Sequence, residues 1–314
     1  MKILYCDPAV RTSTSREYRY YDEVFNCLSN DPDIELSLHR LTISDGSQVN
    51  AAADLIVFGL GWFNHGFFTK IPNLNIPSVC ILFKPQNNLS EKLEFCRANN
   101  VSRIMTPIPS PDQYEKVTGI KTCLFPYGYC EETFKPRPEI EKDVDVGFSG
   151  ALHGNSHYPI GAFPVENIRE KIGQKLENMK DISTFWKSSD TASSRISSYE
   201  EYAKKICSAK IWIATQAAFG DITPRYYEVM SSGTLLMCQK IPDQYKHILI
   251  HGQNCVEFEN DLSDFEEKVI LLANDHDLRR RITDRAVQDS REHTWSQRSQ
   301  RLVEILREIT NETR

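Results

Sequence analysis

The sequence predicts an α/β protein built from two Rossmann-like domains that face a cleft. Short apolar runs alternate with stretches of helical periodicity along the chain, a pattern typical of parallel sheets covered by helices on both faces. The chain has 314 residues, which exceeds the size at which one hydrophobic core usually stops growing. Prolines and glycines interrupt both periodicities at residues 125–138, and this interruption favours a domain boundary near the middle of the chain.

Residues 1–127 are expected to form the N-terminal domain. The chain opens on an apolar run of the length of a buried strand, and the next stretch places Tyr21, Val24, Phe25 and Leu28 on one helical face. The expected strands are Lys2 to Cys6, Glu35 to Leu41, Asp54 to Gly59, Ser78 to Phe83, Arg103 to Thr106 and Thr122 to Phe125, and the expected helices are Glu17 to Leu28, Glu91 to Asn99 and Asp112 to Val117.

Residues 128–143 are expected to be a linker, and residues 144–295 a second domain with the same alternation. Capping-box patterns at Ser198 and Ser263 predict two of its helix starts. A final helical segment, 296–314, is expected to cross back to the N-terminal domain. The strands expected in the second domain are Val144 to Ser149, Ile182 to Trp186, Lys210 to Thr215, Thr234 to Gln239 and Cys255 to Phe258.

Composition excludes several classes of partner. The net charge is −6 and no long basic stretch occurs, so nucleic acid is not expected to bind. No segment is apolar for long enough to cross a bilayer, and Asp7 comes too early for the apolar region of a signal peptide. The nine cysteines form no Cys-x-x-Cys pair, which indicates reduced thiols and a cytoplasmic protein.

Residues 219–238 are the most informative segment, because they have the build of a loop, a short helix, a tight turn and a buried strand. Thr223 is expected to cap the helix, Pro224 to fit its first turn and Gly233 to supply the turn that ends it. The N-terminus of such a helix presents unpaired N–H groups and a partial positive charge, where a diphosphate could rest.

Arg225 and Glu228 lie three residues apart on this helix and therefore share a face. Together they offer a fixed cation for phosphate and a carboxylate for sugar hydroxyls. The alternative is an Arg–Glu pair that only staples a surface helix. The loop at 151–165 is longer than most α/β connections, and long loops at strand ends often carry function.

Four phrases of the sequence together resemble GT-B glycosyltransferases, and most nearly the CgeB-type spore-maturation group. They are Phe-Pro-Tyr-Gly-Tyr-Cys-Glu-Glu-Thr-Phe-Lys-Pro (125–136), Asp-Val-Gly-Phe-Ser-Gly (145–150), the Arg225-x-x-Glu228 helix and His-Thr-Trp-Ser-Gln-Arg (293–298). The resemblance covers most of residues 120–310. It implies that the C-terminal domain binds a nucleotide-diphosphate sugar and that the acceptor enters from the N-terminal domain.

The resemblance also implies roles for individual residues. Glu228 corresponds to the glutamate that accepts hydrogen bonds from donor hydroxyls, usually those of the ribose. Arg225 corresponds to the basic residue one turn earlier, and Gly150 to the glycine that lets a loop backbone approach the phosphates. Tyr226, on the same helix, completes the donor-binding set together with Thr223.

The chain departs from this family pattern at one position. Retaining members often carry a second glutamate eight residues before the ribose-type glutamate, and this sequence has Gly220 there, with Asp221 beside it. Asp221 is therefore our catalytic candidate in this domain, and the stereochemical outcome stays open.

The loop after the strand at 54–59 supplies a second catalytic candidate, His65, which could act as a base or bind the acceptor. A histidine with only a surface role is the alternative. The same loop half matches a dinucleotide fingerprint, but Asn64 replaces the third glycine, so no NAD site is expected. Asp143-Val-Asp145 precedes its strand, and the spaced histidine pairs lack a third ligand. No metal site and no cofactor are expected.

These observations predict a metal-independent glycosyltransferase that moves a sugar from a nucleotide-diphosphate donor to a hydroxyl of a glycan, a lipid-linked acceptor or a protein-borne acceptor. Two other classes remain open. One is a nucleotide-sugar-binding or structural module that has the fold without catalysis, favoured by Gly220. The other is a sugar-nucleotide epimerase on the same two-domain fold.

Overall fold

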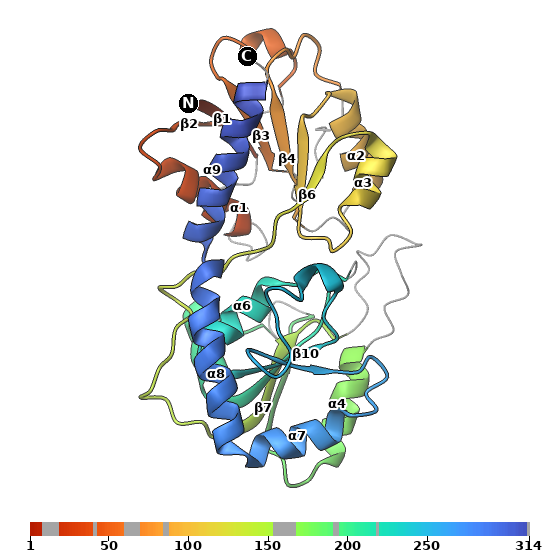
Figure 1. Cartoon of the computed structure of the whole chain (residues 1–314), viewed down its shortest axis with the longest axis vertical. Helices are drawn as coiled ribbons and strands as arrows, with labels where there is room; N and C mark the ends of the chain where they lie inside the picture. The colour runs from red at the N-terminus through yellow and green to blue at the C-terminus, as the bar shows by residue number, and fades with distance from the viewer. Residues whose placement is uncertain are drawn as a thin grey trace. The chain divides into compact units, whose positions relative to one another are not determined.

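The computed structural model describes residues 1–7, 19–39, 43–59, 70–83, 88–152, 168–190, 195–217 and 220–312. The chain forms two compact units. Unit 1 combines Met1–Tyr127 with Trp295–Arg314, and unit 2 is Gly128–Thr294. The segment at 128–143 thus belongs to unit 2, and the C-terminal helix belongs to unit 1. Each unit has a parallel sheet with helices packed on it (Figure 1), and the predicted α/β class is confirmed.

Unit 1 has its strands in the order β2-β1-β3-β4-β5-β6, and every described strand pair is parallel. The chain places β2 on one side of β1 and then continues through β3 on the other side. The order therefore reverses between β1 and β3. The elements described in unit 1 are β1 (Lys2–Cys6), α1 (Arg19–Ser29), β2 (Glu35–His39), β3 (Leu55–Gly59), β4 (Ser78–Ile81), α2 (Leu89–Ala98), β5 (Arg103–Thr106), α3 (Asp112–Thr118), β6 (Thr122–Leu124) and α9 (Trp295–Glu312).

The central strands of unit 1 are buried on both faces. All five residues of β3 and all four residues of β4 are buried, as expected for parallel strands covered by helices. On one side of the sheet, α9 packs beside α1 (Figure 1). Arg103, buried at the start of β5, holds α9 through an ion pair of 3.3 Å with Glu308. The C-terminal helix is thus an integral part of unit 1.

Unit 2 repeats the design with its strands in the order β11-β10-β9-β7-β8, again parallel throughout. Here the order reverses between β7 and β9, because β8 lies on the other side of β7. The elements described in unit 2 are β7 (Val144–Gly150), α4 (Ile168–Asn178), β8 (Thr184–Ser188), α5 (Tyr199–Cys207), β9 (Ala209–Ala214), α6 (Pro224–Ser231), β10 (Leu235–Gln239), β11 (Val256–Phe258), α7 (Phe265–Asn274) and α8 (His276–Ser290).

Helix α4 is the element that sequence reasoning missed. Ile168, Ile172 and Leu176 recur at four-residue intervals and enter a core shared with β7, β9 and α7. Its glycine, Gly173, lets the helix approach the indole of Trp186, because a Cβ there would meet Nε1 at 3.1 Å. The helix therefore owes its place to packing rather than to a cap that can be read in the sequence.

Two predicted boundaries in unit 2 were wrong. The strand expected from Ile182 begins at Thr184, because the Ile182 N–H donates to the Met179 carbonyl in a turn and does not join the ladder. The capping box at Ser263 does not form, because Asp264 is the N-cap of α7 and makes no side-chain cap. The box at Ser198 is confirmed in its main bond, in which the Ser198 hydroxyl accepts from the Glu201 N–H at 3.1 Å.

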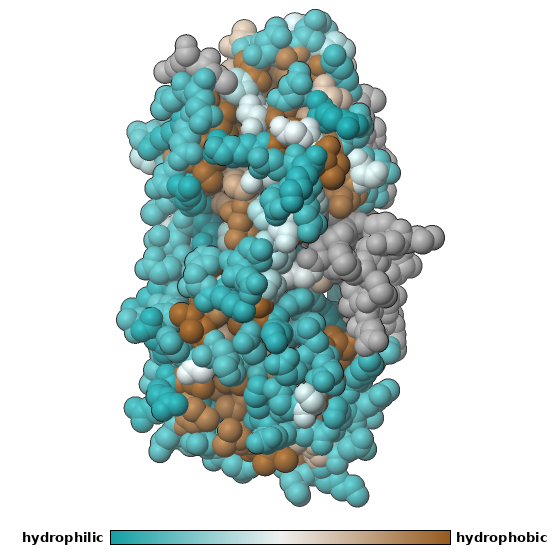
Figure 2. Space-filling model, turned by 45° about the vertical axis from the view of Figure 1, so that its right-hand side comes forward, coloured by the Kyte–Doolittle hydropathy of each residue, from teal (hydrophilic) through white to brown (hydrophobic). Residues whose placement is uncertain are grey.

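Hydrophilic residues cover most of the face seen in Figure 2, where hydrophobic residues appear in scattered groups. Within the described residues, no helix combines the length and apolar character that a membrane span requires.

Candidate functional site

The carboxyl edge of the unit 2 sheet is where a ligand site is expected. In open parallel sheets, ligands bind outside the carboxyl ends of the strands at the point where the strand order reverses. In unit 2 that point lies between the ends of β7 and β9, at Gly150 and Ala214. The residues gathered there decide which ligand the unit can take.

The sequence of β7 explains how its end is built. Val146 and Phe148 alternate into the core beneath α4 and α7, and Gly147 makes room on the other face for Trp212, which a Cβ would meet at 2.3 Å. At Gly150, an added Cβ would lie 2.8 Å from the Phe148 ring and 3.5 Å from Nη2 of Arg225. Glycine at this strand end therefore lets an aromatic ring and a guanidinium lie close to the backbone.

Arg225, predicted from its place on the 219–238 segment, lies at this strand end. Its guanidinium carbon is 5.6 Å from the centre of the Phe148 ring, and its Nε donates to the Tyr202 hydroxyl at 3.0 Å. A ring contact of this kind restrains the orientation of an arginine. The cation is thus held in one orientation before any ligand arrives.

A second arginine, Arg169, reaches the same ring from the first turn of α4. Its guanidinium carbon lies 5.8 Å from the centre of Phe148. Its Nε donates to the Thr215 hydroxyl at 2.7 Å, and its Nη1 donates to the Ala151 carbonyl at 2.8 Å. Because Ala151 follows β7 and Thr215 follows β9, Arg169 joins the two strands across the point of reversal.

Arg169 was not singled out from the sequence, although one signal was available. It lies in the first turn of α4, directly after the segment that the sequence predicts to be a long loop, and a helix that follows such a loop at a strand end is a frequent ligand-binding position. Arg169 was missed because the helix that carries it was not predicted.

The N-terminus of α6 adjoins the two arginines. Thr223 is the N-cap and Pro224 fills the first turn as predicted, but the predicted side-chain cap is wrong, because the Thr223 hydroxyl makes no cap hydrogen bond. Among the described residues, this buried hydroxyl and that of Tyr226 have no hydrogen-bond partner. Burial raises the pKa of Tyr226, and the charges of Arg169 and Arg225 oppose that rise, which places its ring near both cations.

Helix α6 is not a surface helix, so the reading of an Arg–Glu staple on a solvated face was wrong. Every residue of α6 except Arg225 is buried, and Glu228 is only 6% exposed. The backbone carbonyl of Glu228 accepts hydrogen bonds from the hydroxyls of Ser231 and Ser232 at 3.0 and 2.7 Å. The helix ends at the predicted turn, where Gly233 has a φ of 68°.

Asp221 lies in the loop before α6 and is 2% exposed. Its backbone carbonyl accepts from the Ala217 N–H at 3.0 Å, and this bond closes a turn in which Gly220 has a φ of 75°. A glutamate at position 220 would be strained in that conformation, which gives a physical reason for the departure from the family pattern. The other catalytic candidate, His65, lies outside the described residues.

Two segments whose sequences resemble GT-B glycosyltransferases, 125–136 and 293–298, contact each other in unit 2. The Tyr129 N–H donates to the His293 carbonyl at 3.2 Å, and the His293 ring lies 5.2 Å from that of Tyr227 on α6. Residues far apart in the sequence thus support the helix that carries Arg225.

The described residues contain no group of three histidine, cysteine, aspartate or glutamate side chains that could hold a metal ion. Asp145, part of the Asp-x-Asp pattern, lies at the amino end of β7, where it pairs with Lys210 at 2.6 Å and accepts from Ser183. That pattern therefore serves the edge of the sheet far from the arginines.

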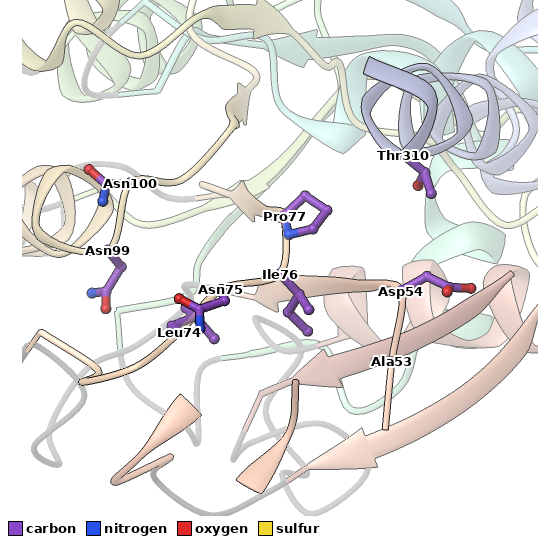
Figure 3. Close-up of a pocket in the computed structure, with 9 residues that line it drawn as sticks. All are labelled: Ala53, Asp54, Leu74, Asn75, Ile76, Pro77, Asn99, Asn100 and Thr310. Carbon is purple, nitrogen blue, oxygen red and sulfur yellow. The ribbon is translucent and has the colours of Figure 1, made fainter. Parts of the chain in front are cut away.

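Unit 1 has a hollow of about 500 Å³ at the amino edge of its sheet. The side chains drawn in Figure 3 come from segments that precede β3, β4 and β5 and from α9. This is the edge opposite to the one where ligands of parallel sheets bind. We therefore do not assign the hollow to the site.

Two fixed guanidinium groups beside a helix N-terminus define an anion site, and an arginine fork fits phosphate best. Comparison with known proteins bears on the nature of that anion. Residues 162–304 match the sequence model of a family described as glycosyl transferase-like. No curated protein matched the chain.

Solved structures of similar fold cover almost the whole chain. Sucrose-phosphate synthase from Thermosynechococcus elongatus matches with a TM-score of 0.64 at 12% identity, over 99% of this chain and 100% of that one. HepE from Anabaena, solved with UDP-glucose, matches with a TM-score of 0.64 at 12% identity, over 98% and 100% of the two chains. A glycosyltransferase from Rickettsia africae matches with a TM-score of 0.60 at 11% identity, over 98% of each chain. The chain thus has the GT-B fold.

Proposed function

We propose that the protein is a glycosyltransferase that takes a sugar from a nucleotide-diphosphate donor bound by unit 2. One observation carries the proposal: Arg169 and Arg225 converge on Phe148 at the strand-order reversal of unit 2. Both cations keep their charge at any physiological pH. The match of residues 162–304 to a glycosyl transferase-like family and the binding of UDP-glucose by HepE support this choice of ligand.

In this proposal the arginines bind the two phosphates and stabilise the charge that develops on the departing diphosphate. Glu228 accepts hydrogen bonds from donor hydroxyls, and Gly150 lets the backbone approach the phosphates. The hydroxyls of Thr223 and Tyr226 are buried donors without a partner among the described residues, and a phosphate oxygen would satisfy them. Because arginines and the helix N-terminus supply the positive charge, we propose that the reaction needs no metal.

The acceptor in this proposal is a hydroxyl of a glycan, a lipid-linked acceptor or a protein-borne acceptor, and the protein acts in the cytoplasm. We also propose the kinship with CgeB-type proteins as the nearest one. Asp221 and His65 remain the catalytic candidates chosen from the sequence.

A thermal-shift panel tests donor binding. UDP, GDP, ADP, TDP and CMP would be compared with UDP-glucose, UDP-galactose, GDP-mannose and GDP-fucose, on wild type and on Glu228→Ala and Arg169→Met. A ligand that binds only the folded state at 100 times its Kd stabilises that state by about 2.7 kcal/mol. We expect one nucleotide to raise the melting temperature of wild type and to lose its effect in both variants. No stabilisation by any nucleotide would overturn the proposal.

A nucleotide-sugar-binding module without catalysis is the second candidate, favoured by Gly220. It predicts the same melting shifts without any release of nucleotide from the bound sugar nucleotide. Nucleotide release with EDTA present would favour the transferase and would also support the absence of a metal requirement.

A further inference from the structure

Tyr202, on helix α5, contacts one of the two arginines of the anion site in unit 2. Its hydroxyl accepts a hydrogen bond from Nε of Arg225 at 3.0 Å. The Arg225 guanidinium also lies 5.6 Å from the centre of the Phe148 ring. A ring contact limits the tilt of the guanidinium plane, and a hydrogen bond to Nε limits its rotation within that plane. The hydroxyl and the ring therefore constrain the same cation in two different ways.

Packing inside unit 2 fixes the ring of Tyr202. The residue is only 6% exposed. Its ring meets that of Phe134 at 78° and that of Trp212 at 72°, with 5.9 Å between the ring centres in each pair. Edge-to-face contacts of this kind are favourable and directional. Trp212 in turn lies where it does because Gly147 on β7 leaves room for its indole. The hydroxyl that contacts the arginine thus belongs to a rigid side chain.

Helix α5 places this side chain on its buried face. The Ser198 hydroxyl accepts from the Glu201 N–H at 3.1 Å and caps the helix. Tyr202 and Ile206 lie four residues apart, so they share a helix face, and both are buried. The aromatic contacts of Tyr202 use its ring, whereas its hydroxyl contacts Arg225. The ring and the hydroxyl can therefore be tested separately.

A neutral hydroxyl restrains an arginine without pairing its charge. A carboxylate in the same place would form an ion pair and compete with a phosphate for the cation. A tyrosine oxygen accepts a hydrogen bond while it stays uncharged. Arg169 is held in the same manner, because its Nε donates to the Thr215 hydroxyl at 2.7 Å. Both arginines of the anion site thus donate from Nε to a hydroxyl.

We propose that Tyr202 is a positioning residue of the anion site, whose hydroxyl orients Arg225 toward the diphosphate of the donor. This inference rests on the proposed function. Tyr202 acts through Arg225 and needs no contact with the ligand. A group that is oriented before the ligand arrives loses less conformational entropy on binding. Without the hydroxyl, Arg225 samples more orientations and the nucleotide binds more weakly.

The test measures the Kd of the nucleotide that stabilises wild type in the thermal-shift panel, by isothermal titration. The variants are Tyr202→Phe, Arg225→Met and the two together. If Arg225→Met binds too weakly to titrate, the same cycle uses Arg225→Lys, which keeps the charge and lacks Nε. Tyr199→Phe is the matched control, because Tyr199 lies on the same helix and its ring packs on Phe134 with 6.0 Å between the centres. Urea unfolding reports the stability of each variant.

We expect Tyr202→Phe to weaken nucleotide binding about tenfold, because a hydrogen bond to a charged group is lost. In the Arg225 variant, adding Tyr202→Phe should change the Kd by less than about twofold, since the hydroxyl acts only through that arginine. A general weakening of the fold would instead lower the affinity equally in both backgrounds. Tyr199→Phe should bind as wild type does.

Three results would overturn the inference. They are binding by Tyr202→Phe within about twofold of wild type, the same loss in the presence and absence of Arg225, and an equal loss in Tyr199→Phe. The proposed function fails in a different way. If wild type binds no nucleotide, that function is wrong and the role of Tyr202 falls with it. If wild type binds nucleotide, Arg225→Met weakens binding and Tyr202→Phe does not, the proposed function stands and only the positioning role is wrong.

Discussion

The two units use one topology and place opposite charges at the equivalent edge. In unit 2 the reversal between β7 and β9 holds Arg169, bonded to Thr215 and Ala151 across the gap. In unit 1 the reversal between β1 and β3 holds the carboxylate of Asp7 beside Gly59. The comparison teaches that a parallel sheet determines where a ligand binds, whereas the side chains at the reversal determine which ligand it is.

The largest expected effect comes from removing the positive charge in unit 2. Arg169→Met keeps much of the side-chain volume but loses the fork, so we expect the affinity for the stabilising nucleotide to fall at least about 30-fold, or about 2 kcal/mol. Isothermal titration measures it. Arg285→Met is the matched control, because Arg285 is an arginine of the same unit whose exposed side chain on α8 pairs with Asp289. Equal losses in both variants would contradict an anion site at β7.

A matched pair of glycine substitutions tests whether the two edges act separately. An added Cβ would lie 2.8 Å from Phe148 in Gly150→Ala and 2.7 Å from Asp7 in Gly59→Ala. Each should destabilise the fold by about 1–3 kcal/mol, because both sites are closely packed. We expect Gly150→Ala to weaken nucleotide binding, and Gly59→Ala, in the other unit, to leave it unchanged.

Titration calorimetry on the two variants, with urea unfolding for stability, separates binding from stability. Nucleotide binding that is weakened equally by Gly59→Ala would show that the division of roles between the units is wrong.

Two buried tyrosines, one in each unit, allow the units to be compared through the free energy of unfolding. The Tyr226 hydroxyl in unit 2 has no partner among the described residues, so Tyr226→Phe should raise the free energy of unfolding by about 1 kcal/mol. It should also weaken nucleotide binding, because the hydroxyl would no longer meet a phosphate oxygen. In unit 1 the Tyr21 hydroxyl makes two bonds to Phe83, so Tyr21→Phe should lower the free energy of unfolding by about 1–3 kcal/mol.

Urea unfolding of both variants shows whether each substitution raises or lowers the free energy of unfolding. A Tyr226→Phe variant that is less stable than wild type would mean that the hydroxyl already has a structural partner, and the phosphate role would lose its support.

The smallest effect is expected at the amino edge of unit 2. Burial alone would raise the pKa of Asp145, but hydrogen bonds from Lys210 and Ser183 outweigh it and hold the pKa below its usual value of 3.8. The stabilisation is thus present above pH 3.8 and is lost as the pH falls through the lower folded-state pKa. Asp145→Asn should cost about 1 kcal/mol at neutral pH.

Urea unfolding of wild type and Asp145→Asn at pH 7 and in acid tests this prediction. The difference between them should shrink toward zero in acid, and nucleotide binding at pH 7 should be the same. Weaker nucleotide binding by Asp145→Asn would mean that charge at the amino edge also matters for the ligand.

Much of the fold could be predicted because local patterns determine it. The buried strand β3 is a continuous apolar run in the sequence. Helix α6 is marked in the sequence by Pro224 at its start and by Gly233 after its end. These signals act over a few residues, so no tertiary information is needed to see them. Arg225 was found in the same way, because its spacing along a helix is local.

What the sequence could not show depends on contacts between distant residues. Helix α4 is held by packing against β7, β9 and α7, and no capping pattern in the sequence predicts it. The Thr223 hydroxyl looked like a cap and makes none, because φ, ψ and neighbours rather than residue type decide whether a capping bond forms. The pairing of Tyr129 with His293 joins segments that are far apart in the chain.

The sequence by itself therefore determined the α/β class, the parallel strands, the position of α6 and one arginine of the anion site. Only the tertiary structure decided the strand order, and with it the two points of reversal. Strand order arises from long-range pairing and packing, which periodicity does not encode. Through that order Arg169 joins Arg225 at one sheet, and Asp7 occupies the equivalent place in the other.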